Sequence, residues 1–156
     1  MMRDTDHAAW ASEAALSTGL PVWIGISAER GKTGQLQGWG RDDCRLEDIV
    51  RALAALRPAV MMIMHTSVND TDEALGVLRK HWGGPIAVYP ECGYFEMPEW
   101  RFIDVIAPDD LVRASRRWQA MGATIFGGCC GIGPSHICAL SSALSSRTRT
   151  GVRVQF

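Results

Sequence analysis

Residues 123–137 read ATIFGGCCGIGPSHI: a short apolar run, a glycine-rich segment with two adjacent cysteines, and a helix start marked by Pro134. Successive side chains of a regular strand point to opposite faces, so Cys129 and Cys130 can reach one ion only where the backbone leaves strand geometry. The flanking glycines permit that departure. We therefore expect a β-strand, then a turn carrying a thiolate metal site, then an α-helix.

Plain packing is the alternative interpretation of the cysteine pair, because free cysteine often behaves as a small buried apolar side chain. Glycines supply no packing and weaken a strand interior, so a Cys-Cys pair among glycines favours a metal or reactive-thiol role. The chain has five cysteines, an odd number that favours thiolate chemistry or metal binding over a disulfide framework. We interpret Cys44 and Cys138 as structural or incidental.

The strand-then-helix order of this segment repeats along the chain. Four apolar runs bounded by Gly, Pro or polar residues are predicted strands: Pro21–Ser27, Ala59–His65, Pro85–Tyr89 and Ala123–Gly127. Capping signals predict five helices: Thr5–Ser17, Leu46–Leu56, Thr71–His81, Asp109–Met121 with Asp109 as N-cap, and Pro134–Leu144. Continuous apolar strands alternating with helices are typical of a parallel sheet, so the sequence predicts an α/β fold. We interpret Val152–Phe156 as a short terminal strand or tail.

Composition sets the class of protein. The chain has 156 residues, 47% of them hydrophobic and 21% charged, with a formal net charge of -1. These values are typical of one globular domain, which we place at residues 1–156, and they give no electrostatic footprint for nucleic acid. No apolar run approaches the roughly 20 residues that span a bilayer, and the N-terminus lacks a signal-peptide core. We expect a cytoplasmic protein without membrane or nucleic-acid partners.

Two long connections follow predicted strands. Ala28–Arg45 carries Trp39, and Pro90–Pro108 carries Cys92 and Tyr94. Both leave the carboxyl ends of strands, where parallel α/β folds place their binding sites. Their aromatic residues either line a substrate pocket or pack over the rim of the sheet.

The quoted residues resemble the homocysteine S-methyltransferase family, a (β/α)8 barrel whose last strand ends in Gly-Gly-Cys-Cys-Gly and continues into a helix through Pro-x-His-Ile. The matching residues are 127–131 and 134–137. Residues 85–90 followed by Gly93 are similar to the seventh strand and its Tyr-Pro-Asn-x-Gly turn, and residues 21–27 look like the fifth strand. The resemblance covers only the C-terminal half of that barrel. It implies four βα units of a TIM-type barrel, a half barrel with a parallel sheet.

One departure from the family concerns the metal ligands. The family's sixth strand ends in Asn-Cys, which gives the first zinc thiolate, whereas this chain has Met64-His65. Imidazole is a good zinc ligand, and a Cys2His set with one open position is a known catalytic arrangement. Cys92 is the competing third ligand. Binding by His65, Cys92, Cys129 and Cys130 together would close the site at four ligands and make it structural.

The other departure is length, because a complete barrel of this kind needs about 250 residues. Four open parallel strands would expose two unpaired edges and the apolar residues meant for the barrel interior. We expect a second copy, a separately encoded N-terminal half, or a rearrangement into a flatter sheet to solve this problem.

The resemblance implies zinc-dependent methyl transfer to the thiol of homocysteine, with activity that needs a second half barrel or a homodimer. Zinc held by His65, Cys129 and Cys130 would bind the substrate thiol and lower its pKa. Gly127, Gly128 and Gly131 would let the backbone approach the substrate, and the methyl donor stays open. The alternatives are a non-catalytic zinc-binding or assembly subunit and, less favoured, a redox thiol protein, for which the usual Cys-x-x-Cys spacing is absent.

Overall fold

The computed structural model describes residues 5–99 and 101–144, and the predicted tail Val152–Phe156 lies outside them. Four parallel strands form one sheet in the order β1-β4-β5-β8, which is also their order along the chain. Their bounds are Trp23–Ile26 for β1, Val60–Ser67 for β4, Ile86–Glu91 for β5 and Ile125–Phe126 for β8. Sequential order of parallel strands is what a (β/α)8 barrel requires.

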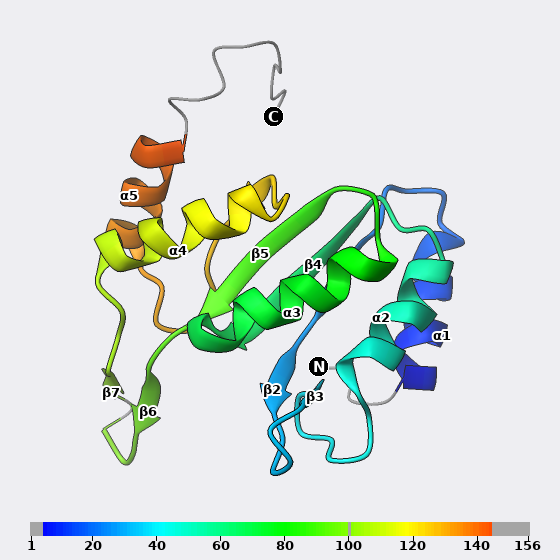
Figure 1. Ribbon diagram of the computed structural model, residues 1–156, viewed down its shortest axis with the longest axis horizontal. Coiled ribbons are helices and arrows are strands. Elements are labelled where there is room, and N and C mark those ends of the chain that lie inside the picture. The colour runs from blue at the N-terminus through cyan, green and yellow to red at the C-terminus, as the bar shows by residue number, and fades with distance from the viewer. Residues whose placement is uncertain (1–4, 100, 145–156) are drawn as a thin grey trace.

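Five helices accompany the sheet: α1 (Thr5–Leu16), α2 (Leu46–Ala55), α3 (Val68–His81), α4 (Pro108–Ala120) and α5 (Pro134–Leu144). Each helix packs against the next one along the chain, and α3 lies across β4 and β5 in Figure 1. The predicted α/β class and parallel sheet are therefore confirmed. The sheet is open and has the arrangement of part of a TIM-type barrel.

The two faces of the sheet differ in burial. Residues that share the helix-covered face through the strand register are buried, namely Ile24, Ile26, Met61, Ile63, Ile86 and Val88. On the opposite face of β1 and β4, Trp23 is 51% exposed and Met62 and Met64 are only partly buried. In a barrel that second face would be the interior, so the described residues bury one side of the sheet and leave the other partly open.

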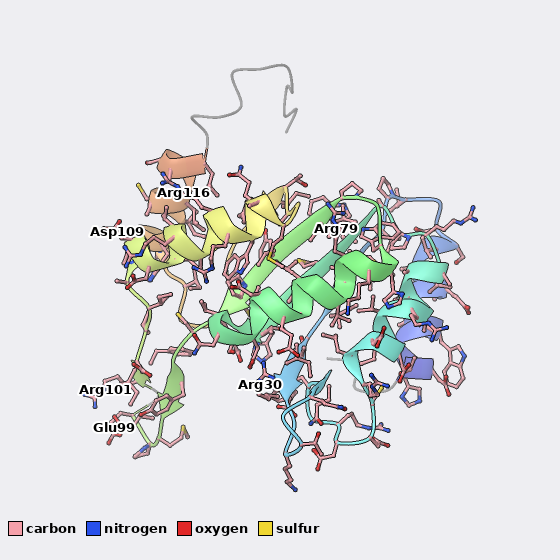
Figure 2. The ribbon with its side chains drawn as sticks, in the orientation of Figure 1. Arg30, Arg79, Glu99, Arg101, Asp109 and Arg116 are labelled. Atoms are coloured by element: carbon pink, nitrogen blue, oxygen red, sulfur yellow. The ribbon has the colours of Figure 1, made fainter. Side chains whose placement is uncertain are left out.

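The helices are anchored to one another by a buried core and by a few polar contacts. Trp118 of α4 is fully buried, and its indole N–H donates to Asp72 of α3. The charged side chains labelled in Figure 2, including Arg79, Asp109 and Arg116, lie on the helices and ribbons around the outside. None of the described helices has the length and apolarity that crossing a membrane requires.

Two predicted helix starts are wrong. The helix expected from Thr71 begins at Val68, because the Ser67 hydroxyl accepts a hydrogen bond from the Asp70 backbone N–H and caps it. The expected N-cap Asp109 lies inside α4, which begins at Pro108. Proline suits the first helical position because its missing N–H has no intrahelical partner there.

Each long connection contains a short antiparallel ribbon rather than loop alone. β2 (Ala28–Arg30) pairs with β3 (Leu36–Gly38), and β6 (Tyr94–Glu96) pairs with β7 (Arg101–Ile103). Both ribbons extend from the carboxyl ends of β1 and β5 (Figure 1). They therefore stand beside the edge of the sheet where the sequence predicts the site.

Candidate metal centre

The predicted site lies where β4, β5 and β8 end. These strands are parallel neighbours, so their carboxyl ends meet at one edge of the sheet. His65 lies near the carboxyl end of β4, Glu91 ends β5, and the Cys129-Cys130 pair follows β8. Residues from three separate βα units are thereby brought to one place.

A bulge in β4 sets the direction of His65. The register between β4 and β5 shifts between Met64 and Ser67, and His65 itself has φ +46°, a left-handed conformation that non-glycine residues rarely adopt. Bulges re-aim side chains at the ends of strands. Fully buried Thr66 holds the bulge of β4 in place. Its hydroxyl donates to the Met64 carbonyl at 3.1 Å and accepts a hydrogen bond from the Ala28 N–H at 3.0 Å.

The glycine-rich turn carries the two cysteines past the end of β5. The Cys129 N–H donates to the Pro90 carbonyl at 2.9 Å, and the Cys92 N–H donates to the Cys130 carbonyl at 3.0 Å. Gly131 has φ +76°, and a Cβ there would collide with the Cys92 carbonyl. The backbone therefore leaves strand geometry at the cysteines, as the glycines predict.

The ligand atoms of His65, Cys129 and Cys130 form one cluster. The His65 Nδ1 lies 3.6 Å from the Cys129 Sγ and 3.8 Å from the Cys130 Sγ, and the two sulfurs lie 3.8 Å apart. All three side chains are partly buried. A tetrahedral zinc with bonds of about 2.3 Å to sulfur and 2.0 Å to nitrogen has edges of about 3.8 Å between sulfurs and about 3.6 Å from nitrogen to sulfur. The three atoms therefore already have the spacing that a tetrahedral zinc needs.

The electrostatics of the cluster also suit a cation. The Glu91 Oε2 lies 2.7 Å from the His65 Nδ1, which places a carboxylate against the imidazole of the cluster. Burial, then the hydrogen bond and charge of Cys129, and then the charge of Glu91 raise the pKa of the Cys130 thiol. A bound cation would reverse this effect, since metal ions deprotonate the thiols that coordinate them.

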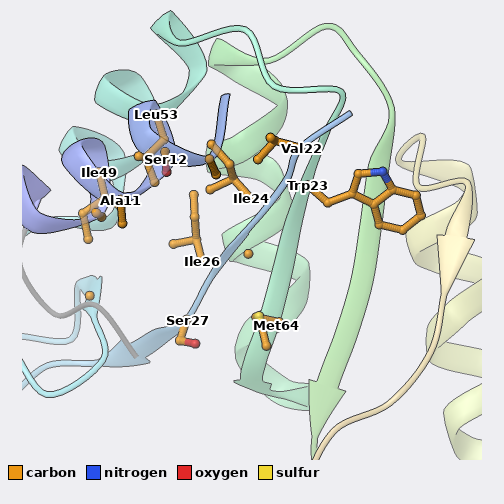
Figure 3. A pocket seen from close by; sticks show the side chains of 14 residues that line it. Ala11, Ser12, Val22, Trp23, Ile24, Ile26, Ser27, Ile49, Leu53 and Met64 are labelled. Atoms are coloured by element: carbon orange, nitrogen blue, oxygen red, sulfur yellow. The ribbon is translucent and has the colours of Figure 1, made fainter. Parts of the chain in front are cut away.

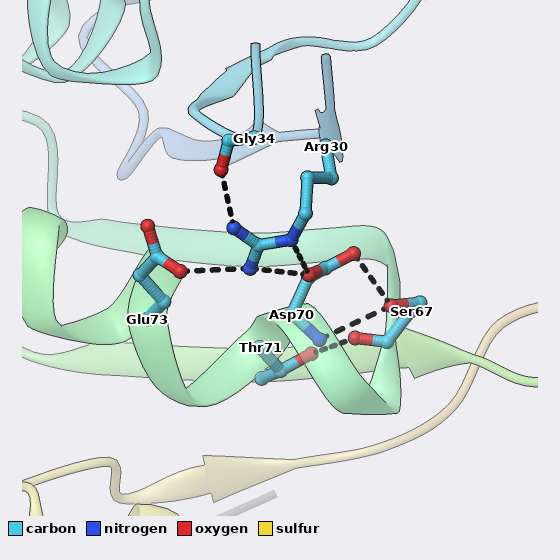
Figure 4. Close-up of polar contacts among 6 residues, drawn as sticks. All are labelled: Arg30, Gly34, Ser67, Asp70, Thr71 and Glu73. Carbon is cyan, nitrogen blue, oxygen red and sulfur yellow. Dashed lines mark hydrogen bonds and ion pairs between the residues drawn. The ribbon is translucent and has the colours of Figure 1, made fainter. Parts of the chain in front are cut away.

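The ribbon of β2 and β3 covers one side of the cluster. The Trp39 ring, just after β3, stands edge-on to the His65 ring with the ring centres 5.5 Å apart. Figure 4 shows how Arg30 of β2 ties the ribbon to the start of α3: its guanidinium donates to Asp70 at 2.6 Å and to Glu73 at 2.7 Å. Arg30 also donates to the Gly34 carbonyl at 2.6 Å. The ribbon is therefore fixed to the segment that directly follows His65.

The other sequence candidates lie outside the cluster. The Cys92 sulfur is not among the ligand atoms grouped within 4.8 Å of one another in the described part of the chain, and burial raises the pKa of this thiol. Cys44 contacts the Thr5 hydroxyl, and Cys138 is exposed on α5. The structure thus brings His65 and the cysteine pair together. Cys92, the competing candidate for the third ligand, is not part of this group.

Gly127, Gly128 and Gly131 have packing roles of their own. A Cβ on Gly127 would collide with the Tyr89 ring, and one on Gly128 would collide with Ile132. Their predicted contact with substrate stays a prediction.

Sequence reasoning missed Glu91, although a signal was present: in the stretch similar to Tyr-Pro-Asn-x-Gly, Glu91 stands at the asparagine position.

Comparison with known proteins identifies relatives. Residues 1–144 match the family described as homocysteine S-methyltransferase. Homocysteine S-methyltransferase 1 of Zea mays is 30% identical over 133 residues, which cover 83% of this chain and 39% of the relative. Betaine–homocysteine S-methyltransferase 1 is 27% identical in Bos taurus and 25% in Danio rerio, each over 154 residues that cover 90% of this chain and 37% or 38% of the relative. The chain therefore spans about two fifths of the length of these relatives.

Proposed function

The chain belongs to the homocysteine S-methyltransferase family, and from this membership we propose that it carries the metal-binding part of an enzyme that methylates the sulfur of homocysteine. The relatives with that activity in their names support the substrate. The observation that carries the proposal is the cluster of one imidazole nitrogen and two sulfurs at the carboxyl edge of the sheet. In parallel α/β folds this edge is where reactions take place.

His65, Cys129 and Cys130 would hold the zinc ion and leave one position for a substrate thiol. When bound, zinc lowers the pKa of a coordinated thiol, so that the nucleophilic thiolate is present near neutral pH. The donor set fits zinc, which takes nitrogen and thiolate ligands and keeps an open position in catalytic sites. The spacing of the three atoms supports the same assignment.

The residues around the cluster would position the substrate and limit water. Trp39 covers one side of His65, and its ribbon is pinned to α3 through Arg30. The turn at residues 127–131 brings backbone close to the sulfurs, and side chains are excluded there by Tyr89, Ile132 and the Cys92 carbonyl. We propose that the thiol of homocysteine binds at the cluster, next to the turn at residues 127–131.

The open side of the sheet supports a further part of the proposal, namely that additional strands complete the barrel. In the part of the chain that the structure describes, β1 pairs with β4 alone, and a cavity of about 340 Å³ runs along it between α1, α2 and the strand. Figure 3 shows Ile24 and Ile26 directed toward those helices, while Trp23 lies on the other side of the strand. The added strands would cover Trp23 and Met64, whether they come from a further segment, a second copy or another chain.

A metal and activity assay tests the proposal. The reduced, purified chain should bind about one zinc and, with the rest of the barrel supplied, transfer methyl groups from betaine or S-methylmethionine to homocysteine. Absence of zinc binding under reducing conditions would overturn the metal site. Zinc binding without methyl transfer, with the complementing strands present, would instead indicate a non-catalytic zinc-binding subunit.

A further inference from the structure

His136 is a buried histidine that lies outside the metal cluster. It stands in the first turn of α5 and is only 6% exposed. Its Nδ1 accepts a hydrogen bond from the Gly133 N–H at 3.1 Å, and its Nε2 lies 2.7 Å from the Ile106 carbonyl oxygen. A backbone N–H can only donate and a carbonyl can only accept, so the imidazole is neutral and carries its proton on Nε2.

The two partners of the imidazole belong to different segments. Gly133 ends the turn that carries Cys129 and Cys130, whereas Ile106 lies in the connection between β7 and α4. A glutamate in this place could accept the Gly133 N–H, as in a capping box, but it could not donate to the Ile106 carbonyl. The neutral imidazole does both and therefore joins the loop before α5 to the loop before α4.

The contact with Gly133 leads to Cys129. Gly133 directly follows Ile132, whose N–H donates to the Cys129 carbonyl at 3.1 Å. The Gly133 carbonyl accepts the backbone N–H groups of His136 and Ile137, at 3.1 and 3.3 Å. Both backbone groups of Gly133 are thus bound to the first turn of α5, and they hold the end of the cysteine turn there.

The contact with Ile106 leads to Cys130 by way of Cys92. Burial raises the pKa of the Cys92 thiol, and a hydrogen bond with the backbone of Ile106 acts in the opposite direction. A hydrogen bond lowers the pKa of a thiol when it is donated to the sulfur, so the Ile106 N–H is the donor. The Cys92 N–H in turn donates to the Cys130 carbonyl at 3.0 Å. The two routes from His136 therefore end at the carbonyls of the two adjacent cysteines.

The cysteine turn depends on such contacts because of its composition. Four of the seven residues from 127 to 133 are glycine. Glycine has the widest conformational freedom of all residues, so a turn of this kind keeps one shape only where contacts from outside hold it. The sulfurs that project from this turn lie 3.8 Å apart.

We propose that His136 is a positioning residue for the metal site: through the two hydrogen-bonded routes, called the His136 network, its imidazole holds the backbone of Cys129 and Cys130 in place. This inference rests on the metal site of the proposed function. It also gives Cys92, the competing ligand, a different role, in which its sulfur receives the Ile106 N–H.

The experiment measures the Co²⁺ affinity of the reduced chain by competition with a chelator, the thiolate absorption of the bound Co²⁺, and unfolding in urea. His136→Ala removes both imidazole contacts. His136→Asn keeps an acceptor at the position of Nδ1, and His136→Gln keeps a donor at the position of Nε2. The matched control is Leu140→Ala, which truncates a buried side chain one turn further along α5, outside the His136 network.

His136→Ala should weaken Co²⁺ binding by about tenfold, as the loss of contacts behind metal ligands does. The thiolate absorption of the saturated protein should still report two sulfurs. His136→Asn and His136→Gln should each weaken binding less than His136→Ala, because each keeps one contact. Leu140→Ala should lower the stability to urea and leave the Co²⁺ affinity unchanged.

Amide hydrogen exchange tests the His136 network in the metal-free protein. The N–H groups of Cys92 and Ile132 donate to the two cysteine carbonyls, so they report the end of each route. Both should exchange about tenfold faster in His136→Ala, which is the effect of losing roughly one hydrogen bond. Leu140→Ala should change them much less.

A Cys92→Ala variant tests the second route. It should weaken Co²⁺ binding less than His136→Ala does. The double variant should bind about as weakly as His136→Ala alone, because both changes break the same network. A lower thiolate absorption in Cys92→Ala would show that Cys92 is a metal ligand and would overturn its role in the network.

Other outcomes overturn the inference. If His136→Ala and Leu140→Ala weaken Co²⁺ binding equally, His136 only stabilises α5. If His136→Ala binds Co²⁺ like the wild type, the network does not position the sulfurs. Absence of Co²⁺ binding in the wild type would overturn the metal site of the proposed function, whereas unchanged exchange at Cys92 and Ile132 would overturn the network itself.

Discussion

At the carboxyl ends of the strands, His65, Cys129 and Cys130 bring three ligand atoms together, whereas β1 is an edge strand that, among residues 5–99 and 101–144, pairs on one side only. The first region is fixed by a buried threonine, a glycine turn and a ribbon pinned to α3. The second has a cavity of about 340 Å³ and a half-exposed tryptophan. The described residues thus gather three candidate ligands at one edge of the sheet and leave β1 only partly covered at another.

This difference shows that gathering the candidate ligands and closing a barrel depend on different neighbouring strands. The cluster of candidate ligands draws on β4 and on the turn after β8, and both strands neighbour β5 in the sheet. Closure of a barrel needs partners for both edge strands and for the interior face. A segment of a barrel can therefore bring candidate ligands together while its sheet still lacks partners for its edge strands.

The largest expected effect tests whether the cluster of His65, Cys129 and Cys130 binds zinc in the isolated chain. Cys129→Ser removes one of the two sulfurs and should lower zinc affinity more than about 100-fold, since even changes next to a metal ligand cost 10–100-fold. Zinc retained after gel filtration and chelator competition measure the change. Cys138→Ser on exposed α5 is the control and should keep the metal. Full zinc content in Cys129→Ser would contradict the site.

The next effect compares the two sides of β1. Ile24 is 7% exposed against the helices, so Ile24→Ala should lower the free energy of unfolding by about 2–4 kcal/mol. Trp23→Ser on the open side should change it by less than about 1 kcal/mol. Urea denaturation of the isolated chain measures both. An equal loss in the two variants would show that the second face is already packed.

Thr66 links the bulge to the metal cluster. Thr66→Val keeps the shape but leaves the buried Ala28 N–H without its acceptor, which should cost about 1–3 kcal/mol and weaken zinc binding by releasing His65. Thr71 is equally buried and donates to the carbonyl of Ser67, the residue that caps α3. Thr71→Val should therefore lower stability to urea while zinc affinity stays unchanged, and a matching loss of zinc would remove the special role of the bulge.

The smallest effect lies away from both regions, where His81 of α3 contacts Glu47 of α2 at 2.9 Å. The hydrogen bond from His81 is the main reason that the pKa of Glu47 lies below its usual 4.5. A lowered folded pKa stabilises the protein above the unfolded value, and this contribution disappears as the pH falls through the folded value. Glu47→Gln should lower the melting temperature by about 1–2 °C near pH 6 and leave it unchanged near pH 3. Zinc binding should be the same in both proteins, and a melting difference that persists in acid would contradict the assignment.

The sequence predicted the four parallel strands because each lies in a short apolar run bounded by Gly, Pro or polar residues. It also predicted that the glycines would let Cys129 and Cys130 depart from strand geometry. The start of α3 was misplaced because Ser67 acts both as the last strand residue and as the cap, a double role that a separate search for strands and helices does not detect.

The parts of the site that escaped prediction depend on contacts between distant segments. Glu91 and His65 are brought together only by the register of β4 against β5, and that register contains a bulge. Trp39 was expected to line a pocket or pack over the rim, but its contact with His65 arises from a three-residue ribbon too short to show a strand period. Local patterns specify the elements, while the bulge and the ribbon specify what meets at the site.

The composition of the cluster also determines which ions would compete for it. Two sulfurs 3.8 Å apart beside one imidazole make a soft site, and magnesium and calcium prefer oxygen ligands. These abundant hard cations would therefore bind it weakly. Cadmium, mercury and trivalent arsenic favour paired thiolates, so we expect these toxic ions to compete with zinc for the cysteine pair.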